Sequence, residues 1–273
     1  MPVVILCGGM GTRLREETEF RPKPMLEIGG RPMLWHIMKI YAHYGFKDFI
    51  LCLGYKGDII REFFLNYRAM NNDFVVEPGL EKVTILGNDC QELDWRVTLA
   101  ETGAVNMTGS RLKQVQKYVG NRTFMLTYGD GVGDIDIRAL LDFHRHHSRI
   151  GTVTGVTPGT ARFGEIVGDR GVVVSFAEKP PISAIVNGGF FVFEPDFFNY
   201  IPVEPDCILE RDPLERLAAD RELMVYQHGG FWQCMDTPRD MDALNQLWNQ
   251  RKASWAFWQA ERNGLEIDGG NNR

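Results

Sequence analysis

Hydrophobic residues in the N-terminal quarter of the chain follow two alternating patterns. Residues 3–7 and 49–53 are apolar throughout, which is typical of strands buried on both faces of a parallel sheet. Residues 32–44 and 56–69 instead repeat apolar side chains every three or four positions, which predicts two helices. The order strand, helix, strand, helix predicts a doubly wound α/β fold.

This pattern is interrupted in the middle of the chain and then returns. Residues 74–99 contain short β-rich pieces between glycine, proline and asparagine, and we expect them to form a small antiparallel excursion from the main sheet. The later elements are predicted to be strands and helices followed by a polar tail. They are strands over 124–128, 152–156, 172–176 and 189–193, helices over 137–147 and 238–263, and a tail over 264–273.

Composition excludes several classes of protein. The 273 residues carry 30 lysines and arginines against 36 aspartates and glutamates, a formal charge of −6, so we expect no nucleic-acid or membrane partner. The apolar fraction of 44% is far above that of disordered chains. No apolar run approaches the roughly 18 residues of a membrane span. The five cysteines are scattered and form no C-x-x-C pair, so a reducing cytoplasm is expected.

A glycine-rich loop follows the first predicted strand. Its residues are Gly8, Gly9, Met10, Gly11, Thr12 and Arg13. The backbone N–H groups of such a loop can converge on an anion, although the loop alone could equally be a structural turn. It matches neither a Walker P-loop nor a G-x-G-x-x-G fingerprint. Arg13 and Lys23, which lies between two prolines, add two cations and favour a polyphosphate ligand.

Two aspartates are candidate metal ligands. Asp130 ends a predicted strand between two glycines, and the carboxyl end of an open α/β sheet is where ligands bind. Asp236 stands just before a predicted helix. Their structural alternatives are an Asx turn at Asp130 and a helix N-cap at Asp236. A carboxylate pair beside a phosphate loop would suit Mg²⁺, which favours one or two carboxylates together with phosphates and water.

Another polar group surrounds the end of the strand predicted over 172–176. Glu178 could accept hydrogens from sugar hydroxyls, Lys179 could bind a phosphate, and Asn187 beside two glycines could add donors. The alternative is a solvated Glu–Lys pair. The histidines at 144, 146 and 147 point in different directions on a helix, so we expect a surface helix end and no metal site there. No arrangement supports a covalent nucleophile.

Residues 6–14 (LCGGMGTRL) and 22–25 (PKPM) resemble the signature of the sugar-phosphate nucleotidyltransferases. Within that family the likeness is to the glucose-1-phosphate cytidylyltransferases. Five further stretches support it, at residues 28–39, 54–57, 107–113, 127–132 and 230–237. The chain departs from the family at Cys7, where alanine is usual, and residues 74–94 match poorly.

The resemblance implies a single Rossmann-like domain over residues 1–263, with a mixed, mainly parallel sheet flanked by helices. It implies a homo-oligomer, by likeness a hexamer. The implied reaction is Mg²⁺-dependent transfer of CMP from CTP to α-D-glucose 1-phosphate, giving CDP-glucose and pyrophosphate. CDP-glucose would supply dideoxyhexoses of bacterial surface polysaccharide, such as the O-antigen of lipopolysaccharide.

The resemblance also implies roles for individual residues. Arg13 and Lys23 would be catalytic, and Asp130 and Asp236 would hold Mg²⁺. The nucleotide would be bound by Leu6, Gly8, Gly9, Gly11, Thr12, Arg13, Lys23, Thr102, Gly103 and Arg111. The sugar phosphate would be bound by Tyr128, Gly129, Glu178, Lys179, Asn187, Gly188 and Gly189.

The expected chemistry needs no side-chain nucleophile. The sugar phosphate oxygen would attack the α-phosphorus of CTP in line, and a phosphate monoester is already ionised at neutral pH. Positioning and charge neutralisation would then supply most of the acceleration. Two alternatives stay open, namely thymidylyl or uridylyl transfer and a non-catalytic nucleotide-binding regulatory protein. Loss of Lys23, Asp130 or Asp236 would favour the second, and all three residues are present.

Overall fold

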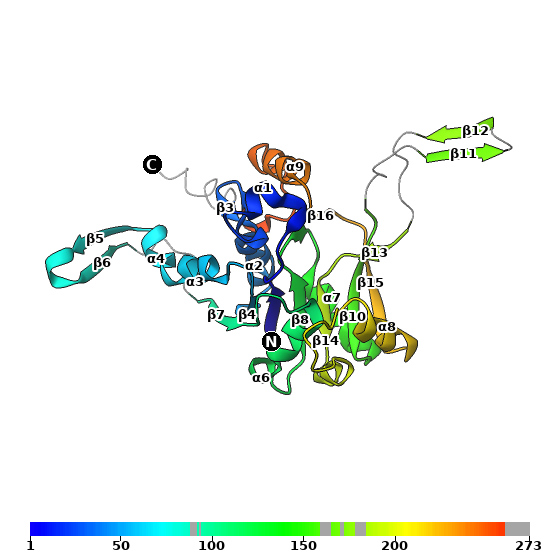
Figure 1. Ribbon diagram of the computed structural model, residues 1–273, viewed down its shortest axis with the longest axis horizontal. Helices are drawn as coiled ribbons and strands as arrows, with labels where there is room; N and C mark the ends of the chain where they lie inside the picture. Colours follow the sequence, from blue (N-terminus) through cyan, green and yellow to red (C-terminus); the bar gives the residue numbers. More distant parts are fainter. Residues whose placement is uncertain (88–91, 93, 159–164, 170–171, 178–183, 260–273) are drawn as a thin grey trace, which may run out of the picture.

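An eight-stranded sheet forms the centre of the molecule in a computed structural model that describes residues 1–87, 92, 94–158, 165–169, 172–177 and 184–259 (Figure 1). The strand order is β13, β10, β14, β8, β1, β4, β7, and β15 also pairs with β10. These strands are β1 (Pro2–Leu6), β4 (Asp48–Leu53), β7 (Arg96–Glu101), β8 (Phe124–Tyr128), β10 (Gly151–Val156), β13 (Val186–Asn187), β14 (Phe191–Phe193) and β15 (Leu223–His228). Strands β7, β4, β1 and β8 are parallel, whereas β14 is antiparallel to β8. The expected mixed, mainly parallel sheet is confirmed.

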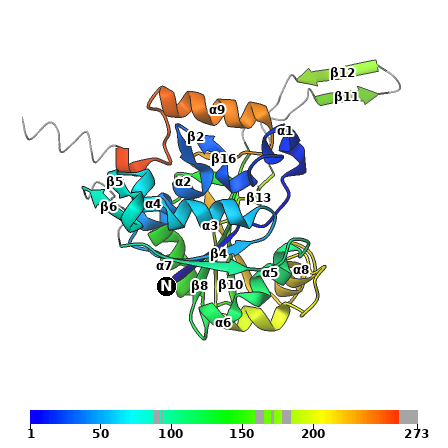
Figure 2. The ribbon, with the colours of Figure 1, turned by 60° about the vertical axis from the view of Figure 1, so that its left-hand side comes forward.

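Helices cover both faces of the sheet (Figure 2). One face packs against α2 (Met33–His43), α3 (Gly57–Leu65), α7 (Ile137–His147) and α9 (Pro238–Asn249). The other packs against α5 (Thr108–Gln114), α6 (Gln116–Val119), the 3₁₀ helix η4 (Pro195–Tyr200) and α8 (Asp212–Ala219). Within β1, Val3 and Ile5 join the first core while Val4 and Leu6 join the second. Because both faces are buried, the strand is apolar throughout.

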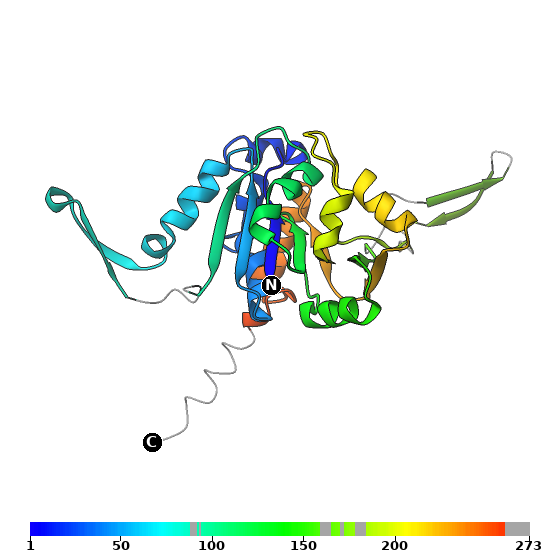
Figure 3. The ribbon, with the colours of Figure 1, turned by 90° about the horizontal axis from the view of Figure 1, so that it is seen from below.

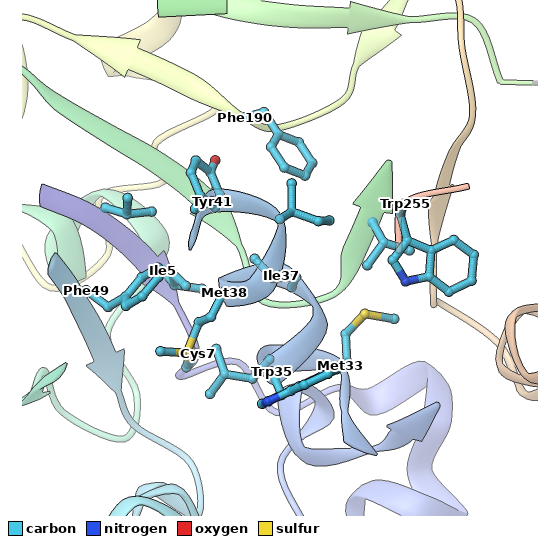
Figure 4. Close-up of a cluster of buried hydrophobic side chains, with 14 of the residues drawn as sticks. Ile5, Cys7, Met33, Trp35, Ile37, Met38, Tyr41, Phe49, Phe190 and Trp255 are labelled. Carbon is cyan, nitrogen blue, oxygen red and sulfur yellow. The ribbon is translucent and has the colours of Figure 1, made fainter. Parts of the chain in front are cut away.

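The first core is built around α2. Figure 4 shows Met33, Ile37 and Tyr41 of this helix among side chains from several strands. The Tyr41 ring stacks on Phe190, with ring centroids 5.7 Å apart. Cys7 is buried in the same core, so the residue that departs from the family pattern packs inward.

Short elements carry the loops at one end of the sheet. They are η1 (Thr12–Leu14), α1 (Arg15–Thr18), η2 (Lys23–Met25), β2 (Glu27–Ile28), β3 (Arg31–Pro32), β9 (Gly131–Gly133) and β16 (Trp232–Cys234). Strand β16 is antiparallel to β9, with Cys234 opposite Gly131. Since β9 directly follows the end of β8, this pairing brings Asp236 close to Asp130.

One predicted strand lies elsewhere than expected, and another pairs outside the main sheet. Residues 96–99 belong to β7 of the main sheet, parallel to β4 with Val97 opposite Phe49, so assigning residues 95–99 to an antiparallel excursion was wrong. The excursion is the hairpin of β5 (Asp73–Glu77) and β6 (Lys82–Leu86), joined by η3 (Pro78–Leu80). Residues 172–176 belong to β12 (Val172–Ala177), which pairs with β11 (Glu165–Asp169) outside the main sheet. A short apolar run indicates a strand but not its partner. Figures 1 and 3 show the two hairpins projecting from opposite ends of the molecule.

Three further expectations need correction. The helix predicted over 56–69 is divided at Asn66 into α3 and α4 (Tyr67–Met70). Helix α9 ends at Asn249, residues 250–256 are not helical, and the predicted tail lies outside the described residues. The end of α7 is not all surface, because His144 is buried with Nδ1 2.8 Å from Thr152 Oγ1. Within the described ranges, no helix combines the length and apolar character needed to cross a membrane.

Candidate active site

The candidate site lies where the carboxyl ends of neighbouring parallel strands meet. Strands β1, β4, β7 and β8 end there, and a first cavity of about 260 Å³ is lined by Gly8, Gly11, Lys23, Thr108, Arg111, Tyr128 and Asp130, among others. A second cavity of about 380 Å³ is lined by Arg13, Tyr128, Asp130, Asn187, Glu210, Trp232 and Asp236, among others. Tyr128 and Asp130 line both cavities, so the two share a wall.

The glycine loop has its first carbonyl group turned toward the protein. The Gly8 carbonyl oxygen accepts hydrogen bonds from Arg111 Nη2 at 3.0 Å and from the Tyr55 backbone N–H at 3.2 Å. In a trans peptide the following N–H points the opposite way, so the Gly9 N–H faces away from these partners. Gly11 has a φ of +62°, and a Cβ there would lie 2.8 Å from the Thr18 side chain. This geometry suits an anion cradle built from backbone donors.

Arg111 is a buried cation that joins the loop to two other strand ends. Its guanidinium donates to the carbonyl oxygens of Leu53 at 3.0 Å, Gly103 at 2.6 Å and Gly8 at 3.0 Å, and to Thr102 Oγ1 at 3.0 Å. Burial lowers the pKa of this guanidinium, and the charge of Glu101 is among the influences that oppose the shift. Thr102 is completely buried, and Thr102 and Gly103 contact Arg111 without lining either of these two cavities.

Lys23 connects the two candidate metal ligands. Its Nζ lies 2.7 Å from Asp130 Oδ2 and 2.6 Å from Asp236 Oδ1, and Arg13 Nη1 lies 2.9 Å from the other Asp236 oxygen. Burial opposes the charged form of Lys23, but the charge of Asp130 and hydrogen bonds to both aspartates outweigh it and raise the pKa of the lysine. Burial likewise opposes ionisation of Asp236, and Lys23 with Arg13 outweighs it and lowers the pKa of that carboxyl. Both groups are therefore charged at neutral pH.

The cap of α9 is Thr237 and not Asp236. Thr237 Oγ1 accepts the Asp240 backbone N–H at 3.3 Å, and the Asp240 carboxylate accepts the Thr237 N–H at 2.8 Å, which is a capping box. The Asp236 carboxylate instead bonds Lys23 and Arg13. The structural alternative considered for Asp236 is therefore wrong, and its side chain belongs to the site.

Asp130, Cys234 and Asp236 form the group of described residues that could hold a metal. One ligand atom from each lies within 4.8 Å of the others. Burial, reinforced by the two carboxylates, raises the pKa of the Cys234 thiol and keeps it protonated. The ligands available to a hard cation are therefore the carboxylate oxygens of the two aspartates.

The second cavity has backbone groups of residues 187–189 at one side. Asn187 Oδ1 accepts the Gly189 backbone N–H at 2.8 Å, and Gly189 has a φ of +74°. The Trp232 indole Nε1 donates to the Gly188 carbonyl oxygen at 2.8 Å. These contacts hold the segment in a turn with the Asn187 side chain at the cavity wall. Glu178 and Lys179 lie outside the described residues, so their contacts stay predictions.

The structure brings most of the predicted residues to these cavities. The first contains Leu6, Gly8, Gly9, Gly11, Lys23, Arg111 and Gly129, and the second contains Arg13, Asn187, Gly188 and Asp236. Thr12 is exposed in η1 and is absent from the lining of both cavities described here. Sequence reasoning missed the roles of Thr108, Glu210 and Trp232. Only Thr108 and Trp232 lay in family-like stretches, and Glu210 has no sequence signal.

Comparison with known proteins identifies the family. The model of the family described as Nucleotidyl transferase matches residues 2–233. The glucose-1-phosphate cytidylyltransferase of Salmonella typhi is 47% identical over 261 residues, covering 95% of this chain and 100% of that protein. The chain belongs to the glucose-1-phosphate cytidylyltransferases. This confirms the family resemblance expected from the sequence.

Two other proteins place this cytidylyltransferase among its relatives. The Bacillus subtilis protein named probable glucose-1-phosphate cytidylyltransferase is 43% identical over 258 residues, covering 94% of this chain and 100% of that one. The crystal structure of HddC from Yersinia pseudotuberculosis complexed with GMP-PN matches with a TM-score of 0.65 at 22% identity, over 90% of this chain and 99% of that one. The second likeness shows the shared fold.

Proposed function

We propose that this cytidylyltransferase transfers CMP from CTP to α-D-glucose 1-phosphate, releasing pyrophosphate and forming CDP-glucose. The observation that carries the proposal is the position of Lys23, which lines the first cavity and bonds both Asp130 of the shared wall and Asp236 of the second cavity. In this proposal the first cavity, with the glycine loop, takes the nucleotide. The second takes the glucosyl phosphate, so the reacting phosphates meet at Lys23.

The carboxylates of Asp130 and Asp236 suit Mg²⁺, which favours one or two carboxylates together with phosphates and water. When bound, the ion would offset negative charge on the reacting phosphates. Lys23 now makes hydrogen bonds with both carboxylates, and its long side chain can exchange them for phosphate oxygens. The protonated Cys234 thiol is not assigned as a ligand.

The residues of this site need to position the two substrates and neutralise the charge of their phosphates. They do not need to form a covalent intermediate. A bond forms between the glucosyl phosphate oxygen and the α-phosphorus while the bond from the α-phosphorus to the pyrophosphate oxygen breaks. Lys23 and Arg13 offset the charge that develops on the α-phosphoryl oxygens and on the leaving pyrophosphate. The backbone N–H groups of residues 8–11 hold the nucleotide in line with the attacking oxygen.

Pyrophosphate release over the four NTPs, dTTP and several sugar 1-phosphates tests the choice of substrates. We expect CTP with glucose 1-phosphate to give the highest kcat/KM. A tenfold lead for dTTP or UTP, equivalent to about 1.4 kcal/mol, would contradict cytidylyl transfer while leaving the family unchanged. No pyrophosphate from any pair would instead indicate a regulatory protein.

We also infer a homo-oligomer, by family likeness a hexamer. Side chains of the β5–β6 hairpin are exposed although apolar, with Phe74 at 47%, Val76 at 50% and Val83 at 57%. A two-stranded hairpin is marginally stable alone in water, so a second copy of the chain is expected to cover it. Light scattering after size exclusion tests this assembly. Free cysteines at positions 7, 52, 207 and 234 suit a place in the reducing cytoplasm.

A further inference from the structure

The Tyr128 hydroxyl has two polar partners, and both of them line the second cavity. Tyr128 is the last residue of β8, and its side chain lines both cavities. The hydroxyl donates to Glu210 Oε1 at 2.6 Å, and its oxygen accepts Asn187 Nδ2 at 3.2 Å. The hydroxyl therefore bonds two side chains of the second cavity, the carboxylate of Glu210 and the amide of Asn187.

The other oxygen of Glu210 bonds a residue that lines the first cavity. Glu210 Oε2 accepts the Thr108 hydroxyl at 2.8 Å, and Thr108 Oγ1 accepts the Leu209 backbone N–H at 2.9 Å. Thr108 is the first residue of α5, the helix that carries Arg111, and it lines the first cavity. A continuous chain of hydrogen bonds thus runs from Asn187 through Tyr128 and Glu210 to Thr108.

The loop that carries Glu210 is held firmly against the start of α5. The Met107 N–H donates to the Pro205 carbonyl oxygen at 2.9 Å, and the Gly109 N–H donates to the Cys207 carbonyl oxygen at 3.0 Å. A Cβ on Gly109 would lie 2.5 Å from Cys207 Sγ, so the two segments are in close contact. The Glu210 carboxylate is therefore positioned by backbone packing.

The donors and acceptors along this chain of hydrogen bonds can be assigned because a carboxylate only accepts hydrogen bonds. Thr108 and Tyr128 each have one hydroxyl hydrogen, and both are given to Glu210. Tyr128 consequently presents a lone pair toward Asn187 and the second cavity.

We propose that Glu210 is a positioning residue that couples the two cavities, by holding Thr108 on one side and Tyr128 with Asn187 on the other. The inference rests on the proposed function, which assigns the nucleotide to the first cavity and the glucosyl phosphate to the second. Because Thr108 and Tyr128 share one carboxylate, a substrate that takes a hydrogen bond from Thr108 in the first cavity changes what Glu210 offers to Tyr128 and Asn187 in the second, and the reverse also holds. The two substrates should therefore bind cooperatively.

The test measures glucose 1-phosphate binding by calorimetry with and without α,β-methylene-CTP, whose α–β linkage resists cleavage. Cooperative binding typically corresponds to a factor of about five or more, and we expect this in the wild-type enzyme. In Glu210→Gln one acceptor is lost and the hydroxyl directions are no longer set, so the factor should fall to within about twofold of one. Tyr128→Phe combined with Glu210→Gln should add little, because both cut the same chain.

Glu204→Gln makes the same change on an exposed side chain of the same loop and is the matched control, which should keep the wild-type factor. If Glu210→Gln does not fold, Tyr128→Phe and Thr108→Val break the chain at separate points and should each abolish cooperativity. A factor unchanged by these substitutions, in an enzyme that makes CDP-glucose, would overturn the coupling role alone. A wild-type enzyme that makes no CDP-glucose would refute the proposed function and remove the premise of the coupling.

Discussion

Gly8 and Arg111 are packed so closely that only glycine fits beside the guanidinium. The Gly8 carbonyl oxygen accepts a hydrogen bond from Arg111 at 3.0 Å, and a Cβ on Gly8 would lie 2.2 Å from Nη1 of the same side chain. At Gly9, the next position, a Cβ would meet nothing within 4 Å. The two neighbouring glycines therefore have different structural requirements.

We predict that Gly8→Ala lowers the free energy of unfolding by about 1–3 kcal/mol, because the methyl group must displace the buried arginine or the loop. Gly9→Ala, the matched control, should change it by less than about 0.5 kcal/mol, since there is space for the methyl group. Urea denaturation of both variants checks this. Equal losses in the two would contradict the close packing against Arg111.

Asp236 and Thr237 are adjacent, but substituting the first should lower kcat and substituting the second should lower stability. Asp236→Asn keeps the shape but removes charge beside Lys23, so kcat should fall on the order of a hundredfold. Thr237→Ala removes the α9 cap and should cost about 1 kcal/mol of stability with kcat nearly unchanged. Thermal melts and pyrophosphate release on both variants test this. Near-normal turnover of Asp236→Asn in saturating Mg²⁺ would return Asp236 to a structural role.

His36 should make the protein sensitive to mild acid. Its Nε2 lies 2.8 Å from the Ile28 carbonyl oxygen, and burial lowers the pKa of the imidazole to about 4. Between about pH 6.5 and pH 4 the unfolded chain binds a proton that the folded chain does not, so stability falls as the pH falls. The loss from this group is on the order of 3 kcal/mol by pH 4.

The comparison of wild type with His36→Gln isolates this contribution, because glutamine does not titrate. Urea denaturation at several pH values from 7.5 to 4 should show a smaller loss of stability in the variant. Parallel stability curves for the two proteins would show that another group, such as a carboxylate, controls the acid sensitivity.

Glu178 and Lys179 are predicted from the sequence to contact different parts of the sugar phosphate. Glu178→Gln should weaken discrimination between glucose 1-phosphate and galactose 1-phosphate, because the amide adds donors where hydroxyl hydrogens were accepted. Lys179→Ala should raise KM for both sugars by a similar factor, since a phosphate is common to them. The glucose-to-galactose ratio of kcat/KM, measured in each variant, tests these two roles. A ratio that changes only in Lys179→Ala would mean that the two roles are exchanged.

The parts of the fold that depend on residues close together in the sequence were predictable from it. The apolar run of β8 and the periodicity of α7 define both elements at their observed bounds, residues 124–128 and 137–147. The partner of a strand depends on residues far along the chain. For that reason β7 was assigned away from the main sheet, and the pairing of β12 with β11 was not predicted.

Some residues of the candidate site could likewise be predicted from the sequence, and others could not. The glycine loop, Lys23 and Asp130 could be found because they follow predicted strands or stand in a family-like motif. The side-chain role of Glu210 could not be found, since it depends on a loop that reaches the start of α5 in three dimensions. The contacts of Arg111 are equally invisible in the sequence, because most of its partners are backbone oxygens that every residue type has.

The backbone oxygens around Arg111 affect how the sequence can evolve. A carbonyl oxygen is kept in any substitution that leaves the backbone in place. Leu53 and Gly103 therefore accept hydrogen bonds from Arg111 whatever their side chains are. Gly54 differs, because a Cβ there would lie 2.3 Å from Arg111 Nη1. Among homologous sequences, therefore, Arg111 and Gly54 should be lost or kept together, whereas position 53 should vary among apolar residues.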